Sequence, residues 1–175
     1  MLVFILIVPI IIIGIAIKLS SDGPIFFSSE RVGQNNRLFK MLKFRSMKID
    51  TPLLGTDLLD DPESVLTPIG SFLRQWSIDE LPQVLNILRG DMSFVGPRPA
   101  LFNQSVLISL RTEKSIDCIL PGLTGWAQIN GRDELSIYDK VNFDYEYMIK
   151  QSFKFDLKIL WLTYLKVIHK DGISH

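Results

Sequence analysis

The chain begins with an almost purely apolar segment and then changes to a mixed polar pattern. Residues 1–17 carry no charged or hydrogen-bonding side chain, and Lys18 is the first charge. An apolar run at the N-terminus favours a membrane segment over a buried core helix. It is not typical of a signal peptide, because no basic stretch precedes it and no small-residue cleavage site follows it. We therefore expect residues 1–19 to form a membrane-inserted helix and residues 20–175 to form a separate domain.

Pro9 lies in the middle of this run and leaves two forms of the helix open. Proline removes one helical hydrogen bond and kinks a helix. Since a spanning helix needs about 20 apolar residues, one form is a short, kinked span. The other form is a re-entrant helix that enters one leaflet, bends at Pro9 and returns to the same side. Such a bend requires partners for the backbone groups that it frees.

Beyond Lys18, short apolar runs alternate with turn residues, which predicts an α+β fold. The first part is a predicted β-hairpin, made of strands at residues 25–27 and 38–44 and a turn at 33–36. Thr67 followed by Pro68 is typical of a helix N-terminus and predicts a helix that ends near Trp76. Gly90 is expected to end the next helix. Apolar periodicity and turn residues place the remaining predicted helices at residues 79–89, 100–117, 134–150 and 153–169.

The last of these helices is rich in aromatic residues and lysines, including Lys158, Trp161, Tyr164 and Lys166. This pattern fits an amphipathic helix at a membrane interface, where lysines extend their charge to water. It also fits an ordinary helix that packs on the core. The apolar N-terminal segment favours the interfacial interpretation.

Charge and metal-binding residue types narrow the range of functions. Nineteen basic and nineteen acidic residues give a net charge of zero, so we expect no nucleic-acid partner. The 47% apolar content excludes intrinsic disorder. With Cys118 as the single cysteine and only two histidines, neither a multi-cysteine zinc site nor a paired-histidine site can form. Any metal must therefore be a hard cation with oxygen ligands.

Asp79 and Glu80 are adjacent carboxylates at a predicted helix start. With Asp79 as the N-cap, Pro82 falls inside the first turn at no cost, and on spacing alone this capping interpretation is favoured. The functional interpretation uses the same position, because a helix N-terminus stabilises negative charge. An ionised Asp79 could act as a nucleophile, and the pair could hold Mg²⁺ together with substrate phosphates.

A set of cations in polar, turn-rich segments could bind those phosphates. Arginine forks match phosphate geometry, although any single one is more often a surface charge. Arg98 differs because Pro97 and Pro99 restrict the backbone on both sides of it. The candidate phosphate-binding residues are Lys43, Arg45, Arg74, Arg98 and Arg132.

Four long segments, in order, resemble the monotopic phosphoglycosyl transferases, the bacterial sugar transferases that act on polyprenyl phosphate. The chain looks like the short, catalytic-domain-only form of this family. Family members usually have more residues before the helix break than the eight that precede Pro9, so we expect a truncated first arm. The matching segments are DGPIFFSSERVGQNNRLFKMLKFRSMK (22–48), LRQWSIDELPQVLNILRGDMSFVGPRP (73–99), PGLTGWAQINGR (121–132) and FKFDLKILWLT (153–163).

This resemblance implies an enzyme that transfers a sugar-1-phosphate from a UDP-sugar to undecaprenyl phosphate and releases UMP. Asp79 would form a covalent phospho-sugar, and Asp79 and Glu80 would hold Mg²⁺. Lys43, Arg45 and Arg74 would surround the phosphates, and Arg98 and Arg132 would lie near the donor.

The family also implies a place in the cell and a pathway. Its N-terminal helix is re-entrant, and its catalytic domain, here residues 20–175, lies on the cytoplasmic face of the bacterial inner membrane. The reaction would be the first membrane step in the synthesis of capsule, lipopolysaccharide, exopolysaccharide or another glycoconjugate. Downstream glycosyltransferases are expected partners, and the motifs do not distinguish among the sugars that the family uses.

Two alternative functions would use some of the same residues. A non-catalytic, membrane-anchored module that binds nucleotide sugar or anionic lipid would need the arginines and the anchor but not the Asp-Glu pair. A Mg²⁺-dependent phosphodiesterase would pass the intermediate to water and release UMP without an acceptor.

Overall fold

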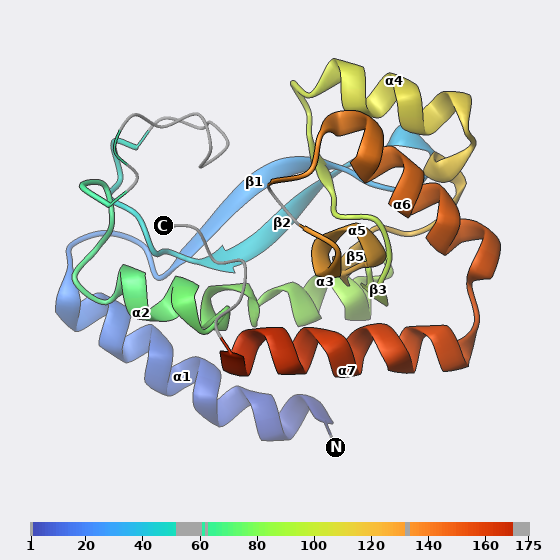
Figure 1. Cartoon of the computed structure of the whole chain (residues 1–175). Coiled ribbons are helices and arrows are strands. Elements are labelled where there is room, and N and C mark those ends of the chain that lie inside the picture. The colour runs from blue at the N-terminus through green and yellow to red at the C-terminus, as the bar shows by residue number, and fades with distance from the viewer. Residues whose placement is uncertain (1, 52–60, 62, 132–133, 170–175) are drawn as a thin grey trace.

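The computed structural model describes residues 2–51, 61, 63–131 and 134–169, which form a mixed α and β structure (Figure 1). Strands β1 (Phe26–Val32), β2 (Leu38–Phe44) and β4 (Ala100–Leu101) form an antiparallel sheet in the order β2-β1-β4. Strands β3 (Ser93–Val95) and β5 (Gly122–Thr124) pair in parallel as a second small sheet. The α+β class expected from the sequence is therefore confirmed.

The β-hairpin is present, but its first strand is longer than predicted. The polar residues after Phe27 were expected to leave the strand, yet β1 continues to Val32 because every residue of it pairs with β2, from Phe26 opposite Phe44 to Val32 opposite Leu38. The turn η1 (Gln34–Asn36) contains two asparagines with positive φ, a conformation that asparagine tolerates better than most residues.

The helices follow the expected order with shifted ends, except that the predicted helix at 79–89 is divided into a 3₁₀ turn, Ile78–Glu80, and a helix that begins at Gln83. The last helix, Phe153–His169, agrees with its predicted range of 153–169. The predicted helix at 100–117 is wrong in its first part, because residues 100–101 pair with β1 as strand β4. The helical elements are α1 (Leu2–Ser20), α2 (Gly70–Gln75), η3 (Ile78–Glu80), α3 (Gln83–Arg89), α4 (Ser105–Glu113), η4 (Ile116–Cys118), α5 (Trp126–Ile129), α6 (Ile137–Lys150) and α7 (Phe153–His169).

Thr67 does not cap α2 as predicted. Its hydroxyl instead donates to the backbone oxygen of Ser46 at 3.3 Å, and α2 begins three residues later at Gly70. The contact with the segment after β2 therefore overrides the local capping preference. Gly90 ends α3 in the left-handed conformation with φ of +83°, as its position predicted.

Helix α1 continues through Pro9 and packs one of its faces on the domain. Ile17 is fully buried with Phe44 of β2 and Leu73 of α2, and Ile10 and Ile13 pack on this cluster from the same face of α1. Among the described residues, no helix is both long enough and apolar enough to cross a membrane. The re-entrant form expected for residues 1–19 stays a prediction.

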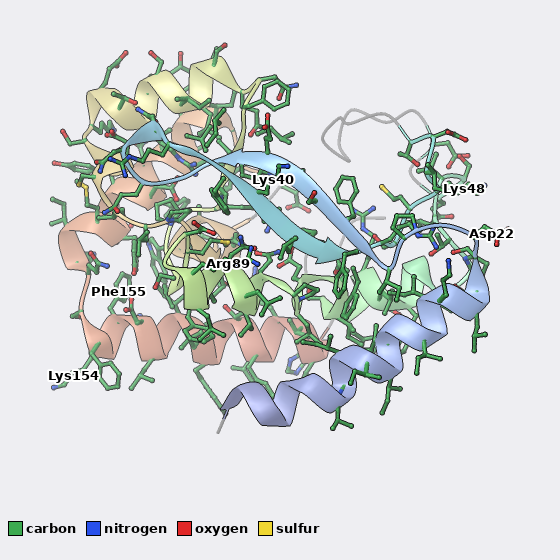
Figure 2. The ribbon with its side chains drawn as sticks, turned by 180° about the vertical axis from the view of Figure 1, so that it is seen from behind. Asp22, Lys40, Lys48, Arg89, Lys154 and Phe155 are labelled. Carbon is green, nitrogen blue, oxygen red and sulfur yellow. The ribbon has the colours of Figure 1, made fainter. Side chains whose placement is uncertain are left out.

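Two other clusters complete the core and connect the remaining elements. Ala100, Leu107, Ile116 and Val141 join β4, α4, η4 and α6. Val95, Tyr147 and Ile159 join β3, α6 and α7. Figures 1 and 2, which view the molecule from opposite sides, show that α1 and α7 lie along the same side of it, while α4 and α6 lie away from α1.

Candidate active site

A tight turn between α2 and α3 carries the carboxylate pair. Asp79 and Glu80 lie in the single 3₁₀ turn η3, which follows Ser77 in the left-handed conformation. Ile78 and Leu81, on either side of the pair, pack on the core cluster of α1, β2 and α2. This packing anchors the turn, and Asp79 is left only 6% exposed.

The capping interpretation of Asp79 is wrong. α3 begins at Gln83, and its N-cap residue is Pro82, which makes no side-chain capping bond. Asp79 lies inside the separate 3₁₀ turn, one turn earlier than a cap of α3 would lie. Its buried carboxylate therefore has no local role in holding the helix end.

Cations from two other parts of the chain meet this pair. Lys43 of β2 donates from Nζ to Glu80 Oε1 at 2.7 Å, and the same nitrogen lies 3.5 Å from Asp79 Oδ2. Arg98, in the loop after β3, donates from Nη2 to Glu80 Oε1 at 3.3 Å. The structure thus brings together four of the predicted site residues, which lie up to 55 positions apart between Lys43 and Arg98.

Burial raises the pKa of the Asp79 carboxyl, and the neighbouring Glu80 raises it further. Lys43 is the main group that lowers this pKa, with smaller contributions from Arg74 and Arg98. The sequence argument that a helix N-terminus keeps Asp79 ionised does not hold, since η3 is a single turn. The ionised form depends instead on these cations, as expected for a buried acid beside positive charges.

The other predicted cations differ in their positions. Arg74 lies on α2 and is close enough to lower the pKa of Asp79. Arg45 is directed elsewhere: its guanidinium donates to the backbone oxygens of Ser21 and Asp22, and it is 4% exposed. These bonds tie the end of β2 to the end of α1, so the structure does not bring Arg45 to the pair. Arg132 lies outside the described residues.

Comparison with known proteins gives the family. Residues 1–170 match the family described as bacterial sugar transferase. The chain belongs to the bacterial sugar transferase family. It is 42% identical to an uncharacterized sugar transferase, EpsL, of Bacillus subtilis over 166 residues, which cover 94% of this chain and 81% of that protein.

Two longer relatives carry names that state an activity. The chain is 41% identical to the UDP-glucose:undecaprenyl-phosphate glucose-1-phosphate transferase of Escherichia coli, over 94% of this chain and 37% of that protein. It is 42% identical to the galactosyl transferase CpsE of Streptococcus agalactiae, over 83% of this chain and 35% of that protein. The chain therefore spans little more than a third of these relatives, whereas it spans most of the Bacillus protein.

Sequence reasoning missed one cation of this sugar transferase. Arg31 of β1 donates from Nη1 to the backbone oxygen of Pro99 at 3.3 Å, next to Arg98. Burial, with a further contribution from Arg98, lowers the pKa of Arg31 to about 10, and Glu80 partly offsets this. Arg31 is thus a charged, half-buried neighbour of the site at pH 7. Residues 28–30, which precede it on the strand, are polar, and only the pairing of β1 with β4 reveals that it lies beside the Arg98 loop.

Asp79 and Glu80 offer carboxylate oxygens, which are the kind of ligand that Mg²⁺ prefers. Mg²⁺ is usually bound by one or two carboxylates together with substrate phosphates and water. Within the described parts of the chain, no group of three or more His, Cys, Asp or Glu residues gathers around a point. Asp79 and Glu80 could therefore supply the protein oxygens, and a diphosphate donor would have to supply others.

Proposed function

We propose that this sugar transferase moves a sugar-1-phosphate from a UDP-sugar to undecaprenyl phosphate through a covalent intermediate on Asp79. The observation that carries the proposal is a buried carboxylate in a tight turn beside Glu80, Lys43 and Arg98. The names of the Escherichia coli relative and of a glucose phosphotransferase from Komagataeibacter xylinus, 42% identical over 163 residues, support the donor and acceptor classes.

The first step is an attack of an Asp79 carboxylate oxygen on the phosphorus that bears the sugar. The bond between this phosphorus and the bridging oxygen breaks, and UMP leaves with the bonding electrons. Lys43 and Arg98 reduce the repulsion between the anionic donor and the anionic nucleophile, because both cations lie at the pair. A bound Mg²⁺ would further neutralise the diphosphate and its leaving oxygen.

In the second step, an oxygen of the lipid phosphate attacks the same phosphorus. The aspartyl–phosphate bond breaks, the sugar-linked lipid diphosphate forms, and the Asp79 carboxylate is restored. Splitting the transfer allows one site to serve first a soluble donor and then a lipid acceptor. Glu80 keeps Lys43 and Arg98 in place through both steps, since it accepts a hydrogen bond from each of them.

The exposed apolar residues of α1 and α7 support a membrane location for this reaction. α1 turns one face towards the core and exposes Val8, Ile12 and Ile15 on the other, and α7 exposes Leu157 and Trp161. Because both helices lie on one side of the molecule (Figure 1), we propose that this side meets the cytoplasmic leaflet of the bacterial membrane. α1 would be inserted there, which brings η3 near the lipid headgroups.

A donor screen with an intermediate-trapping arm tests this function. Purified chain in lipid nanodiscs is incubated with UDP-sugars, Mg²⁺ and undecaprenyl phosphate, and UMP is measured. Without acceptor, mass spectrometry should find one sugar phosphate added to the peptide that contains Asp79. Asp79→Asn should lose the adduct and all but about one part in a thousand of the turnover, because an amide is a far weaker nucleophile.

The matched control is Glu113→Gln, which neutralises an exposed carboxylate at the end of α4 and should leave turnover unchanged. Full activity of Asp79→Asn would overturn the proposal. Binding of UDP-sugar without any adduct or UMP would favour the non-catalytic module, and sustained UMP release without acceptor would favour the phosphodiesterase.

A further inference from the structure

The loop that carries Arg98 is held on both sides by backbone hydrogen bonds. The amide of Gly96 donates to Thr124 O at 2.9 Å, and the amide of Gly122 donates to Pro97 O at 2.9 Å. Arg31 holds the end of the loop through Pro99 O. None of these bonds reaches Arg98 itself, whose side chain faces Glu80.

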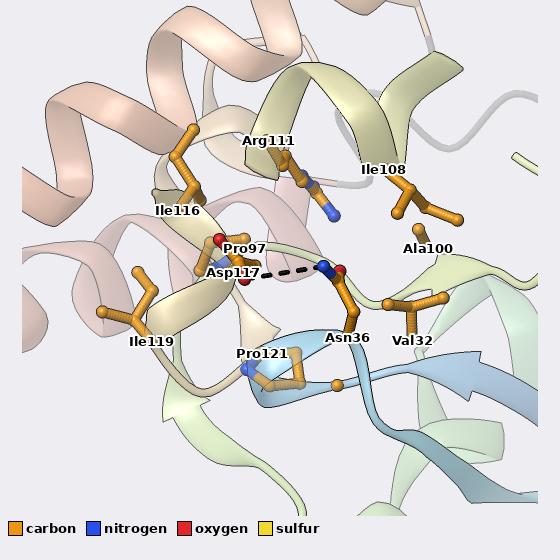
Figure 3. Close-up of a pocket in the computed structure, with 11 residues that line it drawn as sticks. Val32, Asn36, Pro97, Ala100, Ile108, Arg111, Ile116, Asp117, Ile119 and Pro121 are labelled. Atoms are coloured by element: carbon orange, nitrogen blue, oxygen red, sulfur yellow. Dashed lines mark hydrogen bonds between the residues drawn. The ribbon is translucent and has the colours of Figure 1, made fainter. Parts of the chain in front are cut away.

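Arg111 provides the bond to Arg98. From α4, its Nη1 donates to the backbone oxygen of Arg98 at 2.9 Å. Its Nε and Nη2 donate to the same oxygen, Oδ2, of Asp144 on α6, at 2.9 Å and 2.6 Å. Figure 3 shows Arg111 extending from α4 into the pocket that Pro97 also lines. The guanidinium of Arg111 thus links α4 and α6 to the backbone of Arg98.

A contribution to stability does not by itself explain the buried ion pair of Arg111 and Asp144. The Asp144 residue is 1% exposed and the Arg111 side chain is 12% exposed. Burial raises the pKa of Asp144 even with Arg111 beside it, because the cost of taking the carboxylate out of water is large. Buried ion pairs of this kind can often be replaced by apolar residues without loss of stability. The bond to Arg98 O gives the pair a function that apolar residues cannot supply.

We propose that Arg111 and Asp144 are positioning residues for the transfer reaction: they fix the backbone of Arg98 so that its guanidinium stays directed at Glu80. This inference rests on the proposed function, since it concerns the same site. Asp144 orients the guanidinium of Arg111, and Arg111 then holds the Arg98 carbonyl. A lysine has its three N–H donors on a single nitrogen, whereas the three bonds of Arg111 leave from three nitrogens of a planar fork, so a lysine cannot reproduce them.

The test replaces both partners by apolar residues of similar size, which avoids leaving an unpaired buried charge. We expect the double variant Arg111→Met/Asp144→Leu to stay folded, with a Tm close to that of the unsubstituted chain. Its kcat/KM for the UDP-sugar should fall about 10–100-fold, because a misplaced charged group costs catalysis steeply. The single variant Arg111→Lys should also have a lowered kcat/KM for the UDP-sugar, although it keeps the positive charge.

A cycle with Arg98→Ala separates positioning from general damage. If the pair acts through Arg98, adding the double replacement to Arg98→Ala should lower kcat/KM by less than a further twofold. Val141→Ala is the matched control, since Val141 lies on α6 in the same core cluster as Leu107 but has no bond to the Arg98 loop. It should lower Tm and leave kcat/KM within twofold.

Three results would overturn the inference: additive losses in the cycle, an unchanged kcat/KM in the double variant, or a loss no greater than that of Val141→Ala. Failure of the proposed function looks different, because the unsubstituted chain would then release no UMP from any donor. In that case the same variants are compared by their affinity for UDP with Mg²⁺, where the same non-additivity with Arg98→Ala is expected and additivity overturns the inference.

Discussion

Gly96→Ala should disrupt the close parallel pairing that supports the active-site loop. A Cβ atom at Gly96 would lie 2.9 Å from Gly122 N and closer still to Leu120 O. Both neighbours are backbone atoms, one at the start of β5 and one in the segment just before it, so neither can rotate away as a side chain could. The added methyl group must push β3 and β5 apart or displace the loop that carries Arg98.

The size of the effect can be worked from these contacts. Overpacking of a close contact costs about 1–3 kcal/mol. Separating the strands also weakens the two hydrogen bonds that the loop makes, Gly96 N to Thr124 O and Gly122 N to Pro97 O, at about 1 kcal/mol each. A total of about 3–5 kcal/mol corresponds to a fall in Tm of roughly 6–20 °C for a domain of this size.

Thermal unfolding and UMP release together check this prediction. The matched control is Gly90→Ala, because Gly90 has a φ of +83° but a Cβ there would meet nothing within 4 Å. It should cost only about 1 kcal/mol, from the left-handed conformation, and leave turnover intact. Gly96→Ala should have a lower Tm, and its kcat/KM should fall roughly 100-fold because Arg98 moves. A Gly96→Ala protein as stable and as active as Gly90→Ala would refute the argument.

Three further predictions concern other contacts of the domain. Tyr147→Phe removes the hydroxyl that lies 3.1 Å from the Val95 backbone oxygen, and should lower the free energy of unfolding by about 1–2 kcal/mol in thermal melts. Asn86→Ala removes the buried side chain that bonds Leu42 N and Lys40 O on β2, and should cost about 1–3 kcal/mol by the same measurement. Trp161→Glu should weaken liposome flotation several-fold, whereas Tyr138→Glu, at least as exposed but on α6, should not. Equal flotation of the two variants would count against the proposed membrane side.

Local sequence patterns predicted the elements better than their ends. The hairpin, the end of α3 at Gly90 and the whole of α7 were predicted, because each has a signal within a few neighbouring residues. These signals are a run of turn residues between two strands, a glycine after a helix, and a long stretch of apolar and aromatic residues. The start of α2 was not predicted, since the Thr67 hydroxyl bonds to Ser46 across the fold. A capping preference of about 1 kcal/mol is easily outweighed by such a contact.

The site residues divide in the same way. The sequence supplied the pair and five candidate cations, of which Lys43, Arg74 and Arg98 lie near the pair, but residue type alone could not separate Arg45 from Arg31. Arg45 binds the end of α1, whereas Arg31 lies beside the Arg98 loop because β1 pairs with β4. The Arg111–Asp144 link joins residues 33 positions apart on different helices. No periodicity or motif in one sequence reveals such a pairing.

The packing of α1 connects the proposed membrane contact to the position of Asp79, the proposed nucleophile. Ile17 is buried against the cluster that also holds Ile78 and Leu81, the residues on either side of the carboxylate pair. The opposite face of α1 exposes its apolar residues. Because one helix makes both contacts, a displacement of α1 relative to the domain would have to move η3 or open this cluster. If this side meets a bilayer as proposed, the depth of α1 would therefore set the height of Asp79 relative to the lipid phosphates, and the same apolar contacts that fold the domain would align the proposed nucleophile with the proposed acceptor.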